Sequence, residues 1–165
     1  MNGNCHFVLG MGVSATAILL TEPNIDMASG LTAMILLGSI FPDIDNPTSH
    51  FGQLTKPIST IIGKIGEAVG KSEYNHRGVF HDIFLYGIGL VFCIYYKLAL
   101  MWFFIGTLSH LFLDSLTKAG IPIILGQGRF RLAKFKSGDK GSIICTWIIT
   151  ILLVSGVCYY KFIYS

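Results

Sequence analysis

Five stretches of the chain are apolar and carry no charged side chain, and polar segments separate them. They cover residues 7–20, 27–41, 83–96, 98–113 and 143–160. A membrane-spanning helix needs roughly 20 mostly apolar residues, within a range of about 17 to 25. The last stretch has this length, and the others reach it with their polar flanks, which predicts tilted helices or partly buried helix ends. The pattern therefore predicts an all-α membrane protein, a bundle of about five transmembrane helices.

The composition favours the same class over a soluble or disordered protein. The 165 residues are 52% hydrophobic and 13% charged, with a mean hydropathy of +0.63. An average soluble domain is about 25% charged. The length suits a single membrane domain over residues 1–165. No Lys or Arg precedes the first stretch and no small-residue cleavage site follows it, so we expect it to remain in the mature protein.

The positive charges are divided unequally between the two sides that five crossings would create. The side of the N-terminus has Lys56, Lys64, Lys71, Arg77, Lys118, Arg129, Arg131, Lys134, Lys136 and Lys140. The opposite side has only Lys97 and Lys161. Because cytoplasmic loops are enriched in Lys and Arg, this distribution predicts a cytoplasmic N-terminus and a C-terminus outside.

Two polar segments on the N-terminal side have patterns of their own. In residues 55–70, isoleucines and a valine recur at helical spacing, which predicts a short amphipathic helix lying on the membrane. In residues 126–140, Arg and Lys alternate with Phe and Leu, which predicts a hairpin at an anionic lipid surface. Nucleic-acid binding is the alternative interpretation, which we do not favour. We therefore expect a basic interfacial loop over 118–140 and a last transmembrane helix over 143–163.

Histidines and aspartates from four separate segments are expected at this same side of the bundle. They are His6, Asp43, Asp45, His76, His81, His110 and Asp114. The last two are four residues apart, so they project from one face of a helix. Imidazole and carboxylate groups bind zinc, manganese or iron, and a carboxylate can bridge two ions. Seven ligands exceed the needs of one tetrahedral ion, so we expect two or three ions, most simply zinc.

Each of these residues also has an ordinary structural interpretation. A histidine at a helix end, such as His50, is usually an interfacial residue with a satisfied hydrogen bond. Asp43 and Asp45 follow a proline and are typical of a helix cap or an Asx turn. His110 and Asp114 could form a hydrogen-bonded pair between helices. Their joint placement at one end of one bundle favours the metal site.

The motifs in this order resemble the YdjM-type family of bacterial inner-membrane proteins, regarded as metal-dependent hydrolases. The resemblance rests on His6 and on the segments FPDIDNPTS (41–49), NHRGVFHD (75–82) and GTLSHLFLDSLTKAGIP (106–122). It implies a multi-pass protein of the bacterial inner membrane that binds metal through the seven residues named above. The chain departs from the family pattern at Asn46, where a histidine is common, and at Phe80 and Asp82, where Thr and Ser are common. These departures leave the ligands in place but alter their surroundings, which bears on metal choice and substrate.

The family is similar, more distantly, to zinc-dependent phospholipases C and single-strand-specific zinc nucleases, and this likeness alone implies a phosphoester substrate. We therefore expect hydrolysis of a lipid or lipid-linked phosphoester at the cytoplasmic face. A metal ion lowers the pKa of water from about 15.7 to about 7 and so makes it nucleophilic. Asp45 or Asp43 would bridge ions and accept a proton. Arg77, or Arg129 with Arg131, would neutralise charge on the phosphoryl oxygens.

Three other functions use the same residue types. A metal-ion transporter is one, but transport sites usually lie near the bilayer midplane, and the predicted helices carry no charge at their middles. A non-enzymatic membrane regulator with a structural metal is the second. A haem protein with two axial histidines is the third, and a visible absorption spectrum would reveal it.

Overall fold

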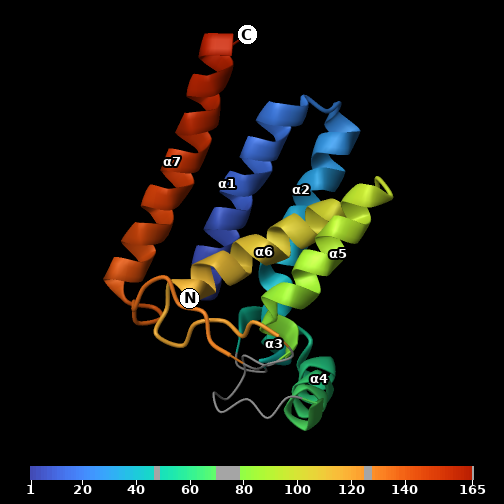
Figure 1. The fold of residues 1–165 in the computed structure, drawn as a ribbon, viewed down its shortest axis with the longest axis vertical. Coiled ribbons are helices and arrows are strands. Elements are labelled where there is room, and N and C mark those ends of the chain that lie inside the picture. The colour runs from blue at the N-terminus through green and yellow to red at the C-terminus, as the bar shows by residue number, and fades with distance from the viewer. Residues whose placement is uncertain (47–48, 70–78, 125–127, 165) are drawn as a thin grey trace.

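The structure is a computed structural model that describes residues 1–165 except 47–48, 70–78, 125–127 and 165 (Figure 1). Its long helices are α1 (Gly3–Thr21), α2 (Ile25–Ile40), α5 (Ile83–Tyr95), α6 (Met101–Ser115) and α7 (Lys140–Tyr164). Shorter ones are η1 (Phe41–Asp45), α3 (His50–Leu54), α4 (Lys56–Val69) and η2 (Val79–His81). The described residues contain no β-strand, so the chain is an all-α membrane protein as predicted.

Every predicted apolar stretch contains a helix, but the helices differ in their ability to cross a membrane. Three are long and apolar enough: Gly3–Thr21, Ile25–Asp45 (α2 with η1) and Lys140–Tyr164. The helices α5 and α6 have 13 and 15 residues, below the length that a bilayer requires. The exact number of five spans is therefore not confirmed.

Polar residues at the helix starts set where α1, α2 and α5 begin. The side chain of Asn24 accepts a hydrogen bond from the amide of Met27, 2.9 Å away. Asp82 does the same for the amides of Phe84 and Leu85 at 2.9 and 3.2 Å. Such caps satisfy amides that have no partner within the helix. The cap at Asp82 fixes the start of α5 directly after His81.

The helices α2 and α6 cross so closely that their backbones touch. A Cβ atom added at Gly38 would collide with the carbonyl oxygen of Phe103, and one added at Gly106 would collide with that of Ile35. Only glycine permits this separation, a role that small residues often have between membrane helices. The crossing brings the end of α2 against the last turns of α6, where His110 and Asp114 lie.

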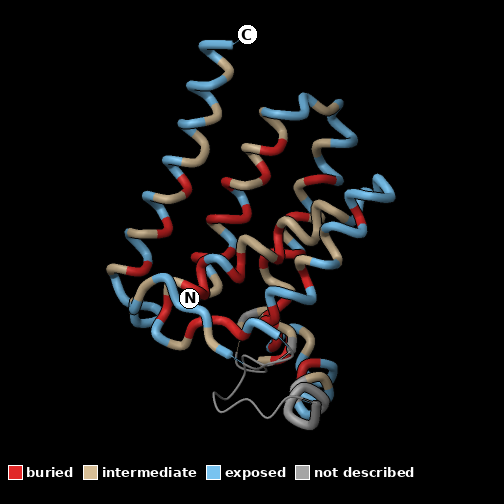
Figure 2. The backbone as a smooth tube through the Cα atoms, viewed as in Figure 1, coloured by how far each residue is buried: buried red, intermediate tan, exposed pale blue. Residues whose placement is uncertain are grey.

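Burial is concentrated where the helices converge on the N-terminal end of the bundle (Figure 2). Four of the predicted ligands there, His6, His81, His110 and Asp114, have an exposed fraction of 1% or less. The outward faces of α5 and α7 are exposed instead, with apolar side chains such as Val91 at 67% and Leu152 at 65%. Apolar side chains on the outward face of a helix are expected where lipid instead of water surrounds the protein.

The segment between α6 and α7 is less regular than the predicted hairpin. It contains two isolated bridges, an antiparallel one between Ile121 and Phe130 and a parallel one between Thr117 and Phe135. The loop therefore folds back on its own start and on the end of α6. The predicted amphipathic helix is present as α4, and its Ile58 and Ile61 are 55% and 60% exposed.

Candidate metal centre

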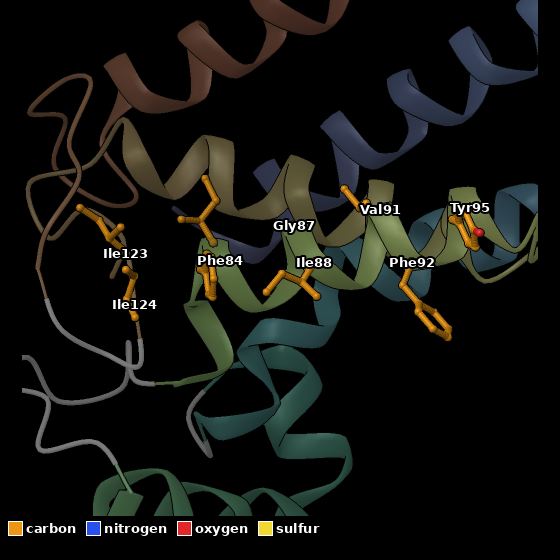
Figure 3. A pocket seen from close by; sticks show the side chains of 9 residues that line it. Phe84, Gly87, Ile88, Val91, Phe92, Tyr95, Ile123 and Ile124 are labelled. Atoms are coloured by element: carbon orange, nitrogen blue, oxygen red, sulfur yellow. The ribbon is translucent and has the colours of Figure 1, made fainter.

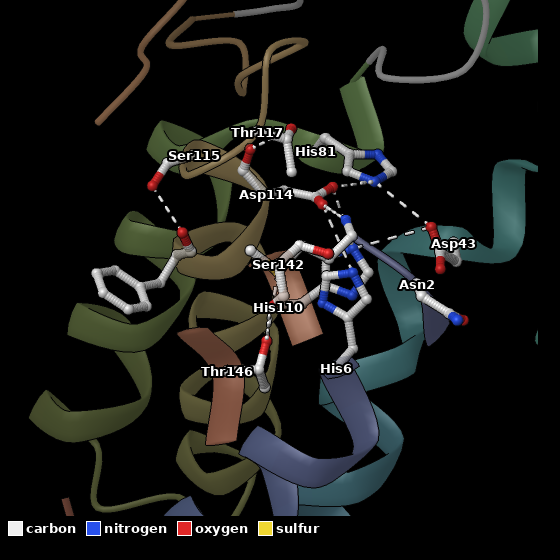
Figure 4. A network of polar contacts seen from close by, with 12 residues as sticks. Asn2, His6, Asp43, His81, His110, Asp114, Ser115, Thr117, Ser142 and Thr146 are labelled. Atoms are coloured by element: carbon white, nitrogen blue, oxygen red, sulfur yellow. Dashed lines mark hydrogen bonds and ion pairs between the residues drawn. The ribbon is translucent and has the colours of Figure 1, made fainter. Parts of the chain in front are cut away.

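Five of the predicted ligands point toward one another at one end of the bundle (Figure 4). His6 comes from the first turns of α1, Asp43 from η1, His81 from the end of η2, and His110 and Asp114 from α6. The ligand atoms form two groups that could each hold a metal ion: His6 with Asp43 and His110, and His81 with His110 and Asp114. Within each group, all ligand atoms lie within 4.8 Å of one another.

Asp114 lies at the middle of the three histidines. Its Oδ1 atom is 3.5 Å from Nε2 of His6, and its Oδ2 atom is 3.6 Å from Nε2 of both His81 and His110. The N-terminal ammonium of Met1 is ion-paired with Oδ1, so this carboxylate already attracts a cation. A carboxylate that faces different partners with its two oxygens has the arrangement of a bridging ligand.

Asp43 faces the same histidines from the other side of the site. Its Oδ1 atom is 3.8 Å from Nε2 of His81 and 3.9 Å from Nε2 of His110. Its side chain is 20% exposed, whereas the histidine side chains opposite are at most 1% exposed. Asp43 is therefore the member of the cluster that can be reached from outside.

The backbone of α2 fixes the orientation of His110. Its Nδ1 atom is 2.7 Å from the carbonyl oxygen of Ser39, which can only accept a hydrogen bond, so Nδ1 carries the proton. The free lone pair is then on Nε2, which points at the two aspartates. The ring of His6 stacks on that of His110 with centroids 3.6 Å apart and planes 12° from parallel. Sequence analysis missed Ser39, since a backbone contact leaves no signal in residue type.

Several buried nitrogens in this cluster have no hydrogen-bond partner among the described residues. They are both ring nitrogens of His6, both of His81, and Nε2 of His110. Buried polar atoms are almost always paired, because desolvation without a partner is unfavourable. Unpartnered imidazole nitrogens opposite carboxylates match the ligand set of zinc, manganese or iron, so these residues fit a metal ion.

Asp45 lies behind His81 instead of between the ligand groups. Its Oδ2 atom is 3.7 Å from Nδ1 of His81, on the opposite side of the ring from Asp43 and Asp114. Burial opposes a charge on His81, but the carboxylates of Asp43 and Asp45 outweigh it and raise the pKa of His81 to about 9. A carboxylate on the outer nitrogen of a metal-binding histidine typically fixes its orientation.

The other predicted site residues are either outside the described part of the chain or away from the cluster. His76 and Arg77 lie outside the described residues. The side chain of His50 also lies outside the described part, although its backbone starts α3. Asp82 caps α5. Arg129 and Arg131 lie in the exposed loop that follows α6.

Comparison with known proteins places these observations in a family. A family profile described as "YdjM inner membrane protein" matches residues 1–162. The proteins named "Inner membrane protein YdjM" from Escherichia coli (strain K12) and from Shigella flexneri are each 35% identical over 107 residues, 59% of this chain. The chain spans about half the length of these curated relatives, since the matched part is 50% of each. No solved structure matches the chain.

Proposed function

The chain belongs to the family of YdjM inner membrane proteins, and from this premise we propose that it is a membrane-bound metal-dependent hydrolase. Its substrate is a phosphoester in a lipid or lipid-linked molecule at the cytoplasmic face. The observation that carries the proposal is the pair of ligand groups that share His110, with buried ring nitrogens that lack a partner. The inner membrane location follows from the family.

The proposed ligands are His6, Asp43, His81, His110 and Asp114. Because Nδ1 of His110 is held by Ser39, its Nε2 would be the atom that binds a metal ion, and the two oxygens of Asp114 face different histidines. A third ion would need further ligands, of which His76 is the candidate. Zinc suits the nitrogen and oxygen donors best, with manganese or iron as alternatives. When bound, such ions supply Lewis acidity for a phosphoryl group and make water nucleophilic at neutral pH.

Side chains of the protein perform the other roles in the proposed hydrolysis. Asp43 is the accessible carboxylate, so we assign it the proton taken from the attacking water, together with a ligand role. Asp45 holds His81 in orientation through Nδ1. Arg77, with Arg129 and Arg131 as alternatives, neutralises the charge that develops on the phosphoryl oxygens. The choice of a phosphoester comes only from the distant resemblance to zinc-dependent phospholipases C that the sequence motifs, His110 and Asp114 among them, suggested.

The position of the cluster supports hydrolysis over transport. The ligands lie where α1 begins and where α2 and α6 end, which is one end of the bundle (Figure 1). A transport site would be expected near the middle of the spanning helices, open in turn to both sides. An accessible Asp43 also supports an exchangeable site over a purely structural metal in a membrane regulator, because a structural site is normally closed.

Metal content tests the proposal directly. The full chain is purified gently in detergent, and its metals are measured by mass spectrometry. We expect about two equivalents of zinc or manganese. His110→Ala should lose this metal, whereas the control Ser109→Ala should keep it, because Ser109 only donates to the carbonyl of Gly106 within its own helix.

Activity is then assayed on vesicles that contain phosphatidic acid or phosphatidylglycerol, and on water-soluble p-nitrophenyl phosphate, with added zinc or manganese. We expect hydrolysis by the wild type and by Ser109→Ala, and none by His110→Ala. Less than about half an equivalent of metal, unchanged by His110→Ala and not restored by added metal, would contradict the site. Full metal content without hydrolysis of any phosphoester would contradict the activity.

A further inference from the structure

One small apolar pocket includes a ligand of the metal centre among its lining residues. It has a volume of about 210 Å³ and is lined by Phe7 of α1, Ile40 of α2, and Phe51 and Leu54 of α3. Asp43 is the one charged residue in the part of the lining that the structure describes. The pocket therefore connects the most accessible ligand of the centre with the outer surface of the spanning helices.

We propose that this pocket is the entrance through which a lipid reaches the metal centre from the membrane. The first part of an acyl or isoprenoid chain lies against Phe7 and Leu54, and the anionic headgroup lies at Asp43. The inference rests on the proposed function and deepens it, because it assigns the lipid a site and a direction of entry.

Two properties of the lining restrict what the pocket can bind. The carboxylate of Asp43 requires a cation beside any bound phosphate, and the apolar walls require an apolar substrate. Asp43 is the only charged group among the described lining residues, and a carboxylate repels a phosphate unless a cation lies between them. The rest of the described lining is apolar apart from Asn4 and includes no Lys or Arg that could hold a soluble phosphoester. Affinity must then come from burial of apolar surface, which a lipid chain supplies.

The position and size of the pocket favour a substrate that stays partly in the bilayer. Phe7 and Leu54 are 48% and 84% exposed, and they lie on a spanning helix and on the short helix next to it. A pocket for an entire small molecule usually has about 300 to 1,000 Å³. At about 210 Å³, this one accommodates only part of a lipid, and the rest of the chain remains among its neighbours in the membrane.

A second apolar pocket provides an internal comparison (Figure 3). It runs along α5, has a volume of about 760 Å³, and includes Phe84, Ile88 and Ile123. It is larger, but its described lining residues include no His, Asp, Glu, Lys or Arg. Ordinary bilayer lipids should occupy it without any relation to the metal centre, so its residues are matched controls.

The test uses a photoreactive lipid, whose readout does not depend on turnover. The full chain is reconstituted in phosphatidylethanolamine vesicles that contain phosphatidic acid with a diazirine close to the ester of one acyl chain. After illumination, labelled peptides are identified by mass spectrometry. We expect label near Phe7 and Leu54. Leu54→Trp should lower that label at least about fivefold because the indole fills the pocket, whereas Phe84→Trp on α5 should leave it unchanged.

Leu54 is largely exposed, so its replacement should not unfold the protein, and Leu54→Asp provides a second variant that places a charge against the apolar lipid chain. Hydrolysis of p-nitrophenyl phosphate should be the same in Phe84→Trp as in the wild type, because the pocket along α5 is separate from the one that contains Asp43. Label at the pocket without any hydrolysis supports the entrance and contradicts the proposed activity. Equal label over both pockets, unaffected by either Leu54 variant, overturns the entrance even if hydrolysis is found.

Discussion

Asp45 differs from the other aspartates of the site by the atom that it faces. Asp43 and Asp114 approach Nε2 of His81, whereas Asp45 approaches Nδ1 on the other side of the same ring. If Nε2 binds metal, Nδ1 carries the proton, and Asp45 is its only acidic neighbour among the described contacts of that atom. Asp45 is then a positioning residue.

We predict that Asp45→Asn lowers the affinity for zinc by about 10- to 100-fold while all ligands remain present. The amide keeps an oxygen opposite Nδ1, but it removes the negative charge that polarises the ring. Asp45→Ala should have the larger effect. The measurement is a competition titration with a chromophoric chelator, and equal affinities for wild type and both variants would make Asp45 irrelevant to the metal.

The protonation of His81 predicts a pH dependence of metal binding. Its pKa is raised to about 9, so the metal-free ring carries a proton at neutral pH, and metal binding must release it. Affinity should therefore rise with pH by up to about tenfold per unit until about pH 9, and level off above it. Calorimetric titrations at several pH values measure this slope. His81→Asn should bind more weakly and with a flatter pH profile, and an equally steep profile in that variant would assign the proton elsewhere.

At the scale of residues, the sequence predicts which residues come together but not which of their atoms face one another. The four-residue spacing of His110 and Asp114 correctly places both side chains on one helix face, since both lie in the same ligand group. The central position of Asp114 and the stacking of His6 on His110 depend on helix crossing angles that no local pattern encodes. Asp43 and Asp45 have the same sequence signal, and only the turn of η1 distinguishes them.

At the scale of elements, the glycine contact between α2 and α6 determines the geometry of the centre. Gly38 is next to Ser39, whose carbonyl orients His110, and Gly106 lies one turn before His110 on the facing helix. Any increase in the helix separation there would lengthen the contact between Ser39 and His110. The packing of α2 against α6 and the orientation of His110 therefore both depend on Gly38 and Gly106.

We predict that Gly38→Ala or Gly106→Ala lowers the stability in detergent by about 1–3 kcal/mol, because the methyl group must push two backbones apart. Bound metal should fall as well. Gly30→Ala and Gly87→Ala are the controls, since nothing lies within 4 Å of a Cβ atom at either position. Thermal unfolding and metal content are measured on all four variants, and equal losses in both pairs would contradict the argument.

The apolar stretches predicted the positions of the long helices but not all of their lengths. Only Lys97 separates the stretch at 83–96 from the next one. In the structure α5 ends at Tyr95, and Lys97 adopts a positive φ of 53° in the turn that follows. The alternation in 126–140 predicted strand pairing, but that segment forms only isolated bridges. Alternation of basic and apolar residues indicates that the two kinds of side chain lie on opposite faces of an extended segment. Pairing into a sheet also requires a second strand, and the end of α6 is helical.

At the scale of the whole molecule, the chain has two chemically different ends. The metal ligands, α3, α4 and the basic loop lie at one end, and the C-terminus lies at the other (Figure 1). Near the second end, Lys161 of α7 forms an ion pair with Glu22, which follows α1. The end of the bundle that holds the metal ligands is therefore also the end that holds the basic loop.

We predict that the ligand-bearing end faces the cytoplasm. Alkaline phosphatase, which is active only outside the cytoplasm, should be active when fused after the C-terminus and inactive when fused after Lys118. Green fluorescent protein at the same two positions should give the opposite result. Active phosphatase at Lys118 with an inactive C-terminal fusion would reverse the orientation and place the proposed chemistry on the outer face.

The wide separation of the ligands along the chain has a consequence for the order of events during synthesis. His6 lies in α1 and is synthesised before its stacking partner His110 and the central Asp114, which belong to α6. A nascent chain that has been synthesised only through η1 holds two of the five proposed ligands, His6 and Asp43, too few to retain zinc. Metal loading therefore has to follow the insertion of α6, whereas α7, which packs on α1 and supplies no ligand, can arrive afterwards.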